Sequence, residues 1–149
     1  MSVNPRKRLL IFIVAYNAEK TIQSVLTRIP VKSLPSGTEV LVIDDSSSDR
    51  TFQTATAHRE AVAGLNVTVL CNPVNQGYGG NQKIGYQYAI EKGFDVVALV
   101  HGDGQYAPEK LPELVASVLA GEADACFGSR MMERGAALHL DAEITLALE

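Results

Sequence analysis

No stretch of this 149-residue sequence is apolar for long enough to cross a membrane. The apolar run LLIFIVA, residues 9–15, is far shorter than the roughly 20 residues of a membrane helix. It also lacks the small-residue cleavage site that follows the apolar part of a secretory signal. We therefore expect neither a membrane helix nor a signal peptide in this sequence, and a cytoplasmic location.

Paired cysteines and a surplus of basic residues are missing too. The two cysteines, Cys71 and Cys126, lie at the ends of apolar runs, where a free thiol usually behaves as a small buried hydrophobe, so we expect both to be reduced core residues. The net charge is −4, and the only basic cluster is Arg6, Lys7 and Arg8, which we interpret as a solvated end of the chain rather than a lipid contact. A nucleic-acid surface would need a basic patch, so no nucleic-acid partner is expected.

What the sequence does contain is the composition of an ordinary globular domain, with 46% hydrophobic and 20% charged residues. Five short apolar runs are each typical of a strand buried on both faces. Four segments with helical spacing lie between them, and Pro30 and Gly121 end the first and the last. The predicted strands are residues 9–15, 39–45, 65–71, 95–101 and 123–129, and the predicted helices are residues 22–29, 49–62, 78–92 and 108–120.

Strands and helices that alternate along the whole chain predict an α/β fold, a Rossmann-like and mostly parallel sheet with helices on both faces. Ligands bind such sheets beyond the carboxyl ends of the strands, where the strand order reverses. The polar residues that follow each predicted strand are therefore the candidates for function.

Four of the five predicted strands are followed by such polar residues, in segments 16–19, 44–49, 101–105 and 128–130. Some of these residues have a structural explanation, because Asn17 and Asp49 are typical helix caps. Asp44 and Asp45 are different, since two adjacent carboxylates repel each other unless a donor or a cation lies between them. We interpret this pair as functional, with a base N–H, ribose hydroxyls or a metal as its partner.

A glycine-rich segment, residues 72–83, follows the third predicted strand and opens the third helix. Gly77, Gly79 and Gly80 would let the backbone approach another group, and the start of the helix could hold an anion. The segment contains neither a dinucleotide fingerprint nor a Walker A motif. Lys83 is its one cation, and this side chain faces either a phosphate or the solvent.

Together these segments resemble the family 2 glycosyltransferases, which are inverting enzymes of the GT-A type, and in particular the branch that uses polyprenyl or dolichyl phosphate. The resemblance spans about residues 8–135. V-A-Y-N-A-E-K-T-I resembles the opening segment of the family, V-I-D-D-S-S-S-D-R-T its nucleotide loop and N-Q-G-Y-G-G-N-Q-K-I-G the start of its third helix. H-G-D-G-Q-Y-A-P-E resembles the metal segment, and F-G-S-R the strand after it. Five motifs in the order and spacing of the family make the resemblance specific.

The resemblance implies which residues bind the nucleotide sugar. Asp44 would bind the base with Asp45 close by, and Arg130 would reach the diphosphate or the incoming phosphate. It also implies that Tyr16 and Glu19 line the nucleotide pocket. With Lys83 and Gly102 added, the donor site that we predict consists of Tyr16, Glu19, Asp44, Asp45, Lys83, Gly102, Asp103 and Arg130.

The resemblance also implies a divalent metal, Mg²⁺ or Mn²⁺. Asp103 is similar to the second aspartate of the DXD motif, and Gln105 to the ligand two residues further on. His101 stands where the family usually has the first aspartate, and it would ligate the ion, donate to a phosphate or pack beside the site. An imidazole suits Mn²⁺ better than Mg²⁺, which prefers oxygen ligands. Ala15 replaces the usual proline, which is a minor departure.

The reaction implied is a metal-dependent, inverting transfer of a sugar from a UDP- or GDP-sugar. Negative charge develops on the departing nucleoside diphosphate, and the ion held by Asp103 and Gln105, with Arg130 alongside, would stabilise it. A saccharide acceptor would need a general base, for which Asp141 and Glu143 are poor candidates. A polyprenyl phosphate acceptor is already ionised and needs none.

We expect residues 1–135 to form the nucleotide-sugar-binding GT-A domain, as the N-terminal part of a longer enzyme. Residues 136–149 would be a tail, either a cloning remnant or helical, and it could pair with a second copy in a homodimer. Acceptor-binding and membrane-attachment elements would lie downstream, at the cytoplasmic face of the membrane, so this chain alone could be inactive.

Two rival classes share some of these features. A non-catalytic nucleotide-sugar-binding module would use the same residues, and only turnover would distinguish it from an enzyme. A phospho-receiver domain also has paired aspartates in a doubly wound sheet, but its acidic pair follows the first strand and its phosphoacceptor the third. Here the third predicted strand ends in Cys71-Asn72-Pro73, which argues against a receiver.

Overall fold

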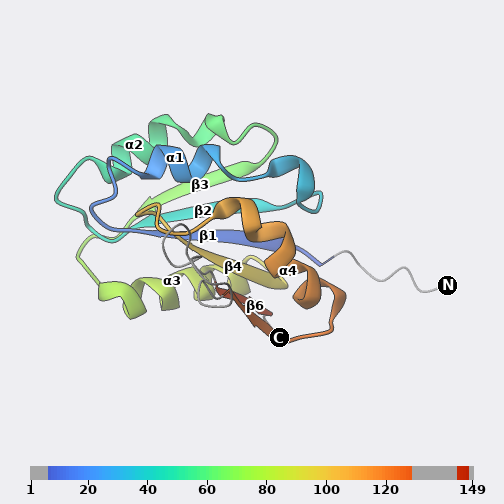
Figure 1. Ribbon diagram of the computed structural model, residues 1–149. Helices are drawn as coiled ribbons and strands as arrows, with labels where there is room; N and C mark the ends of the chain where they lie inside the picture. Colours follow the sequence, from blue (N-terminus) through green and yellow to red (C-terminus); the bar gives the residue numbers. More distant parts are fainter. Residues whose placement is uncertain (1–6, 129–143, 148–149) are drawn as a thin grey trace, which may run out of the picture.

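One sheet of six strands, in the order β3-β2-β1-β4-β6-β5, organises the part of the chain that the computed structural model describes, residues 7–128 and 144–147 (Figure 1). Strands β1 to β4 pair in parallel, and β6 runs antiparallel to both β4 and β5. The predicted α/β fold with a mostly parallel sheet is confirmed. The strands are β1 (Leu9–Ala15), β2 (Glu39–Asp44), β3 (Asn66–Cys71), β4 (Val96–His101), β5 (Ala125–Phe127) and β6 (Ile144–Ala147).

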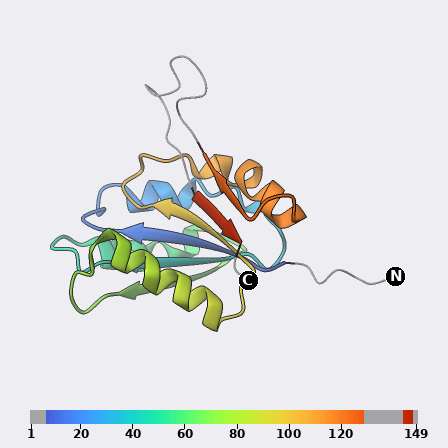
Figure 2. The ribbon, with the colours of Figure 1, turned by 90° about the horizontal axis from the view of Figure 1, so that it is seen from below.

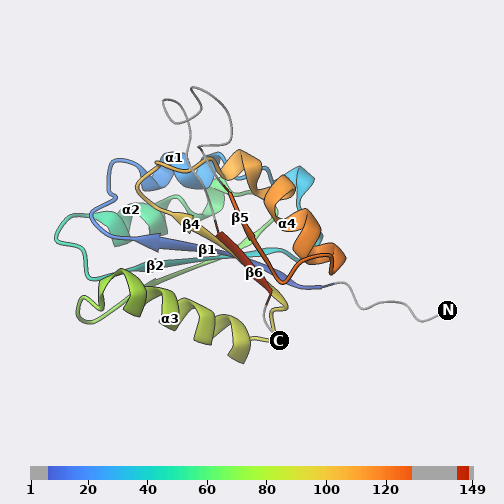
Figure 3. The ribbon, with the colours of Figure 1, turned by 60° about the horizontal axis from the view of Figure 1, so that its bottom comes forward.

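Helices cover both faces of this sheet, as the alternating pattern predicts. Of the helices in the described ranges, α1, α2 and α4 lie on one face and α3 lies on the other (Figures 1 and 3). None of the helices in the described ranges has the length and apolar content to cross a bilayer. The α-helices are α1 (Ile22–Thr27), α2 (Thr51–Ala57), α3 (Gly77–Glu91) and α4 (Leu111–Ala120), and short 3₁₀ turns are η1 (Val31–Ser33), η2 (Arg59–Ala61) and η3 (Pro108–Lys110).

Strand β1 lies at the centre of the hydrophobic core, and all seven of its residues are buried. Leu9, Ile11 and Ile13 belong to the core on the side of α1, α2 and α4. Leu10 and Phe12 belong to the core under α3. Because successive residues of a strand point to opposite faces, this one strand supplies both halves of the core.

The outer strands differ from the prediction that every strand is buried on both faces. The residues of β3 are half-buried or exposed, and Ala125 and Phe127 of β5 are exposed. The reason is their place in the sheet, since β3 and β5 are its two outer strands among the described residues. Cys71 is consequently exposed and Cys126 half-buried, although both thiols are unpaired as expected.

The tail expected at residues 136–149 contributes a strand to the sheet. Residues Ile144–Ala147 form β6, which lies between β4 and β5, so the expectation of a helix is wrong for these residues. The rest of the tail lies outside the described ranges. Figure 2 shows β6 running beside β4 in the opposite direction.

A glycine lets α3 lie directly on β1. Asn81, Gly85 and Ala89, four residues apart, are the buried positions of α3. A Cβ atom at Gly85 would lie 2.1 Å from Cε1 of Phe12, a side chain that is fully buried. The absence of a side chain at Gly85 therefore fixes the distance between helix and sheet.

We expect Gly85→Ala to lower the free energy of unfolding by about 1–3 kcal/mol, because a close-packed core cannot make room for the added methyl group. Gly79→Ala in the same helix is the matched control, since nothing lies within 4 Å of a Cβ at that position. The control should be neutral or stabilise by up to about 1 kcal/mol. Urea unfolding of the two variants measures the difference, and equal stabilities would contradict this account of the packing.

Candidate functional site

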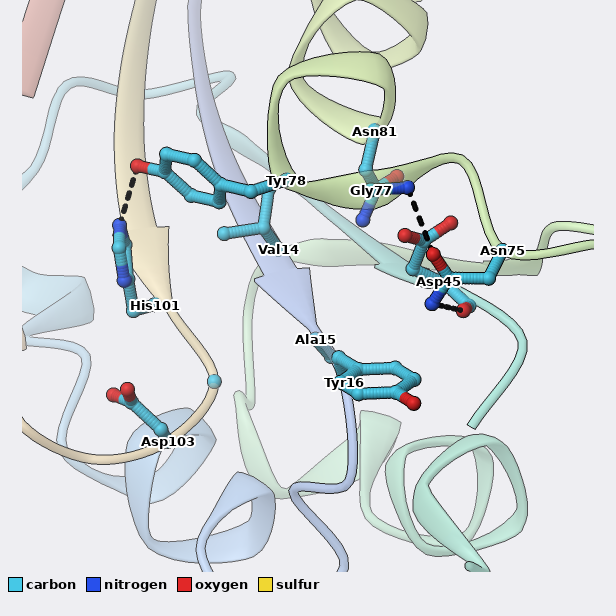
Figure 4. A pocket seen from close by; sticks show the side chains of 11 residues that line it. Val14, Ala15, Tyr16, Asp45, Asn75, Gly77, Tyr78, Asn81, His101 and Asp103 are labelled. Atoms are coloured by element: carbon cyan, nitrogen blue, oxygen red, sulfur yellow. Dashed lines mark hydrogen bonds between the residues drawn. The ribbon is translucent and has the colours of Figure 1, made fainter. Parts of the chain in front are cut away.

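A cavity of about 350 Å³ opens at the carboxyl ends of β1 and β4, where the strand order reverses. This is the place that the rule for parallel sheets predicts. Residues from β1, β4, the start of α3 and the four loops after β1, β2, β3 and β4 contribute to the wall (Figure 4). The lining consists of Val14, Ala15, Tyr16, Asp45, Asn75, Gly77, Tyr78, Asn81, His101, Gly102 and Asp103.

Asp44 does not line this cavity, although the resemblance implies that it binds the base. Its side chain is 2% exposed. Oδ1 accepts a hydrogen bond from the Ser47 hydroxyl, and Oδ2 accepts from the Ser47 backbone N–H and from the Cys71 thiol, both at 3.4 Å. Both oxygens of Asp44 are therefore satisfied by the protein.

Asp45, by contrast, lines the cavity and keeps one oxygen without a donor among the described residues. Its Oδ1 accepts from Asn72 Nδ2 at 2.7 Å and from the Gln76 backbone N–H at 2.8 Å. No described group donates to Oδ2, although the residue is only 3% exposed. A buried carboxylate oxygen without a donor is costly, so this atom suits a ligand that brings an N–H or O–H group.

Three asparagine side chains, of which Asn72 and Asn81 are buried, hold Asp45 and α3 in place. Asn81 donates from Nδ2 to the backbone oxygen of Ile43 at 3.1 Å, and its Oδ1 accepts from Asn72 at 3.3 Å. Asn75 donates to the backbone oxygen of Asp45 at 3.0 Å. These three asparagines were not among the predicted site residues, although they lie in the segment 72–83, whose glycines indicated a close approach of the backbone to another group.

The loops after β1 and β2 bind each other through side chain to backbone hydrogen bonds. Asn17 Oδ1 accepts from the Ser48 N–H, and Glu19 Oε2 accepts from the Arg50 N–H, both at 3.1 Å. Asn17 therefore bridges the two loops instead of capping α1. Glu19, an expected nucleotide-pocket residue, is engaged in this bridge and lies outside the cavity lining as the described residues define it.

Asp49 completes the connection between these loops. Its Oδ2 accepts from the Glu19 N–H at 3.1 Å, and its Oδ1 accepts from the N–H of Thr51, the first residue of α2, at 3.0 Å. Burial alone would raise the pKa of Asp49, but hydrogen bonds from the Thr51 hydroxyl and from backbone N–H groups outweigh it and lower the pKa. This carboxylate is part of the scaffold under the cavity.

Three rings form one side of the site. The Tyr78 hydroxyl and His101 Nε2 are 2.8 Å apart, and the centroids of the two rings are separated by 5.1 Å. The centroid of the imidazole also lies 4.3 Å from that of the Tyr106 ring. Partial burial and then the neighbouring Tyr106 and Asp103 raise the pKa of Tyr78, so its phenol keeps its proton at neutral pH.

Asp103 presents an exposed carboxylate to the cavity, and its Oδ1 accepts from the Gln105 backbone N–H at 3.0 Å. The Gln105 side chain does not belong to the described lining. Within residues 7–128 and 144–147 no three acidic, histidine or cysteine side chains form a metal-binding group. Mg²⁺ commonly takes one or two carboxylates and completes its shell with water and substrate phosphates, so Asp103 fits an ion that binds together with a nucleotide.

The remaining expected site residues are placed as follows. Gly102 lines the cavity close to β1, since a Cβ there would lie 3.1 Å from that of Ala15. Lys83 is exposed on α3 and outside the described lining, which agrees with the solvent alternative. Arg130, Asp141 and Glu143 lie outside the described residues.

Comparison with known proteins gives matches along most of the chain. The family model described as Glycosyl transferase family 2 matches residues 10–141. The chain is 33% identical over 128 residues to the undecaprenyl-phosphate mannosyltransferase of Micrococcus luteus, covering 86% of this chain and 50% of that protein. It is 32% identical over 135 residues to the polyprenol monophosphomannose synthase of Mycolicibacterium smegmatis, covering 90% and 49%.

A similar structure is the mannosyltransferase PcManGT from Pyrobaculum calidifontis in complex with GDP-Man and Mn²⁺, with a TM-score of 0.74. The match covers 97% of this chain and 45% of that one at 17% identity, which supports the fold alone. The chain spans about half the length of the relatives that it matches.

The thiol next to Asp44 should react slowly despite its exposure. Partial burial, and then the hydrogen bond and charge of Asp44, raise the pKa of Cys71, and only the thiolate is an efficient nucleophile. In the Cys126→Ser variant, we expect iodoacetamide to alkylate Cys71 more slowly at pH 8 than it does after unfolding in urea. Equal rates in the folded and unfolded chain would contradict the contact between Cys71 and Asp44.

Proposed function

The chain belongs to glycosyl transferase family 2, and from this we propose that it carries the donor-binding part of an enzyme that transfers a sugar from a nucleotide sugar to a polyprenyl phosphate. The transfer would proceed with inversion at the anomeric carbon. One observation carries the proposal, which is the cavity between β1 and β4 with the open oxygen of Asp45 and the exposed carboxylate of Asp103 in its wall.

We propose Asp45, rather than Asp44, as the residue that recognises the base. Uracil and guanine both carry a ring N–H, which could donate to the open Oδ2 of Asp45. Tyr16 adjoins this end of the cavity and is 55% exposed, and a ring of this kind can stack on any base. Hydrogen bonds from Asn72 and Gln76 hold the carboxylate in position before the ligand arrives.

Asp103 lies across the cavity from Asp45 in Figure 4 and would serve the diphosphate end of the donor. A divalent ion held there together with the phosphates would neutralise the charge of the leaving nucleoside diphosphate. The structure of PcManGT with GDP-Man and Mn²⁺ supports this placement of the donor through the shared fold. Arg130 stays a proposed contact to the same phosphates.

The acceptor in this proposal is a lipid phosphate. The names of the two relatives, which include undecaprenyl phosphate and polyprenol, support it. An ionised phosphate oxygen would attack the anomeric carbon as the bond to the diphosphate breaks, and such a nucleophile needs no general base. The chain could therefore support this chemistry without a further carboxylate in the described residues.

Titration calorimetry of the chain with UDP, GDP, UDP-glucose and GDP-mannose, with and without Mn²⁺, tests this function. We expect one nucleotide to bind in a metal-dependent manner and Asp103→Ala to abolish that binding. Asp124→Ala is the control, because this exposed carboxylate precedes β5 at the opposite edge of the sheet. If none of the four ligands binds, or if both variants bind equally, the proposal is wrong.

The adjacent aspartates provide a second, internally matched test. Loss of a hydrogen bond to a charged group corresponds to about 1.5–3 kcal/mol, so Asp45→Asn should weaken nucleotide binding by about 10- to 100-fold. Asp44→Asn should lower the melting temperature, and wherever it remains folded by circular dichroism it should bind the nucleotide within about threefold of the original chain. The reverse order of effects would favour Asp44 as the base-binding residue.

A further inference from the structure

The register of β4 determines the direction in which His101 points. Val97 and Leu99 belong to the core under α3, whereas Val96, Ala98 and Val100 belong to the core on the other side of the sheet. Since alternate residues of a strand point to opposite faces, His101 faces α3. Its Nε2 meets the hydroxyl of Tyr78, the second residue of α3, at 2.8 Å.

Asp103 lies in the loop beyond β4, and this loop packs against the opposite layer. The Thr21 hydroxyl, next to the start of α1, donates to the Gly102 backbone oxygen at 2.7 Å. A Cβ at Gly104 would be 3.5 Å from that of Thr21. In Figure 4 the His101 ring is turned toward Tyr78, while the Asp103 carboxylate lies on the other side of the ring from Tyr78. The two side chains of this short segment are therefore attached to different layers.

The hydrogen bond to Tyr78 also occupies one of the two ring nitrogens that could bind a metal. Nε2 and the Tyr78 hydroxyl are 2.8 Å apart, so this nitrogen is engaged whichever of the two groups donates. The ring of Tyr106, with its centroid 4.3 Å from that of the imidazole, packs against His101 in this orientation.

We propose that His101 is not a metal ligand: Tyr78 holds its ring toward α3, and Asp103 is the carboxylate of the segment 101–105 that coordinates the divalent ion. This inference rests on the proposed function, which it deepens. It replaces the expectation that His101 ligates the metal together with Asp103. With one carboxylate from this segment, the ion would depend on the nucleotide phosphates for further charged ligands.

The pairing of Tyr78 with His101 can be tested without any nucleotide. We would record ¹⁵N–¹H spectra of the histidine ring nitrogens for the original chain and for Tyr78→Phe. The ring signals of His101, assigned with His101→Ala, should change in Tyr78→Phe because the hydrogen bond to Nε2 is lost. Those of His58, whose Nδ1 lies 2.8 Å from the Thr54 backbone oxygen in α2, should not change. Unchanged His101 signals would overturn the pairing.

A second experiment tests whether a histidine nitrogen coordinates Mn²⁺ when the ion is bound together with the nucleotide. Pulsed electron paramagnetic resonance of chain labelled with ¹⁵N-histidine should show no coupling of Mn²⁺ to a histidine nitrogen. His101→Ala should change the Mn²⁺ dissociation constant by less than about twofold, whereas Asp103→Ala should raise it by more than about tenfold, because only the latter removes a charged oxygen ligand.

The experiments distinguish failure of the inference about His101 from failure of the proposed function. A histidine coupling that disappears in His101→Ala would overturn this inference and leave the proposed function intact. Absence of any nucleotide complex would overturn the proposed function and, with it, the assignment of Asp103 to the metal. The nucleotide-free spectra would in that case still decide whether Tyr78 holds His101.

Discussion

Two buried carboxylates placed side by side are the constraint on which this edge of the sheet depends. Asp44 and Asp45 are 2% and 3% exposed, and buried polar groups of this kind are costly unless they are hydrogen-bonded. The alternation of side chains along β2 separates them, because Val40 and Val42 face one core and Leu41 and Ile43 the other. Each carboxylate thus obtains donors from a different layer, and their mutual repulsion is reduced.

The loops around the site follow from this separation. Asp44 accepts hydrogen bonds from Ser47 and Cys71. Asp45 accepts hydrogen bonds from Asn72 and from the backbone N–H of Gln76. Gln76 is the residue directly before α3, so its hydrogen bond to Asp45 also ties the start of this helix to the end of β2. The cavity is consequently shaped by the protein's own hydrogen bonds, and a ligand would find its walls already in place.

Much of this arrangement could be predicted from sequence, because short apolar runs and helical spacing are local signals. The parallel strands and the position of Asp103 at the cavity followed from them. Which of the two aspartates lines the cavity did not follow from them, although the alternation of side chains along β2 separates Asp44 from Asp45. The pairing of Tyr78 with His101 joins residues 23 positions apart, and no pattern within either segment indicates it. The strand Ile144–Ala147 was missed because its partners come earlier in the chain and run in the opposite direction.

The position of β6 sets the order in which the sheet can be completed. Strands β1 to β4 each pair with a neighbour that has been synthesised by the time β4 leaves the ribosome. Among the described strands β5 pairs only with β6, and β6 comes later in the chain. A nascent chain can therefore pair β1 with β4, whose ends line the cavity, before β6 has been synthesised and β5 (Ala125–Phe127) can pair with it. Completion of the β5 side is thus a late step of folding, governed by the arrival of β6 and not by the donor cavity.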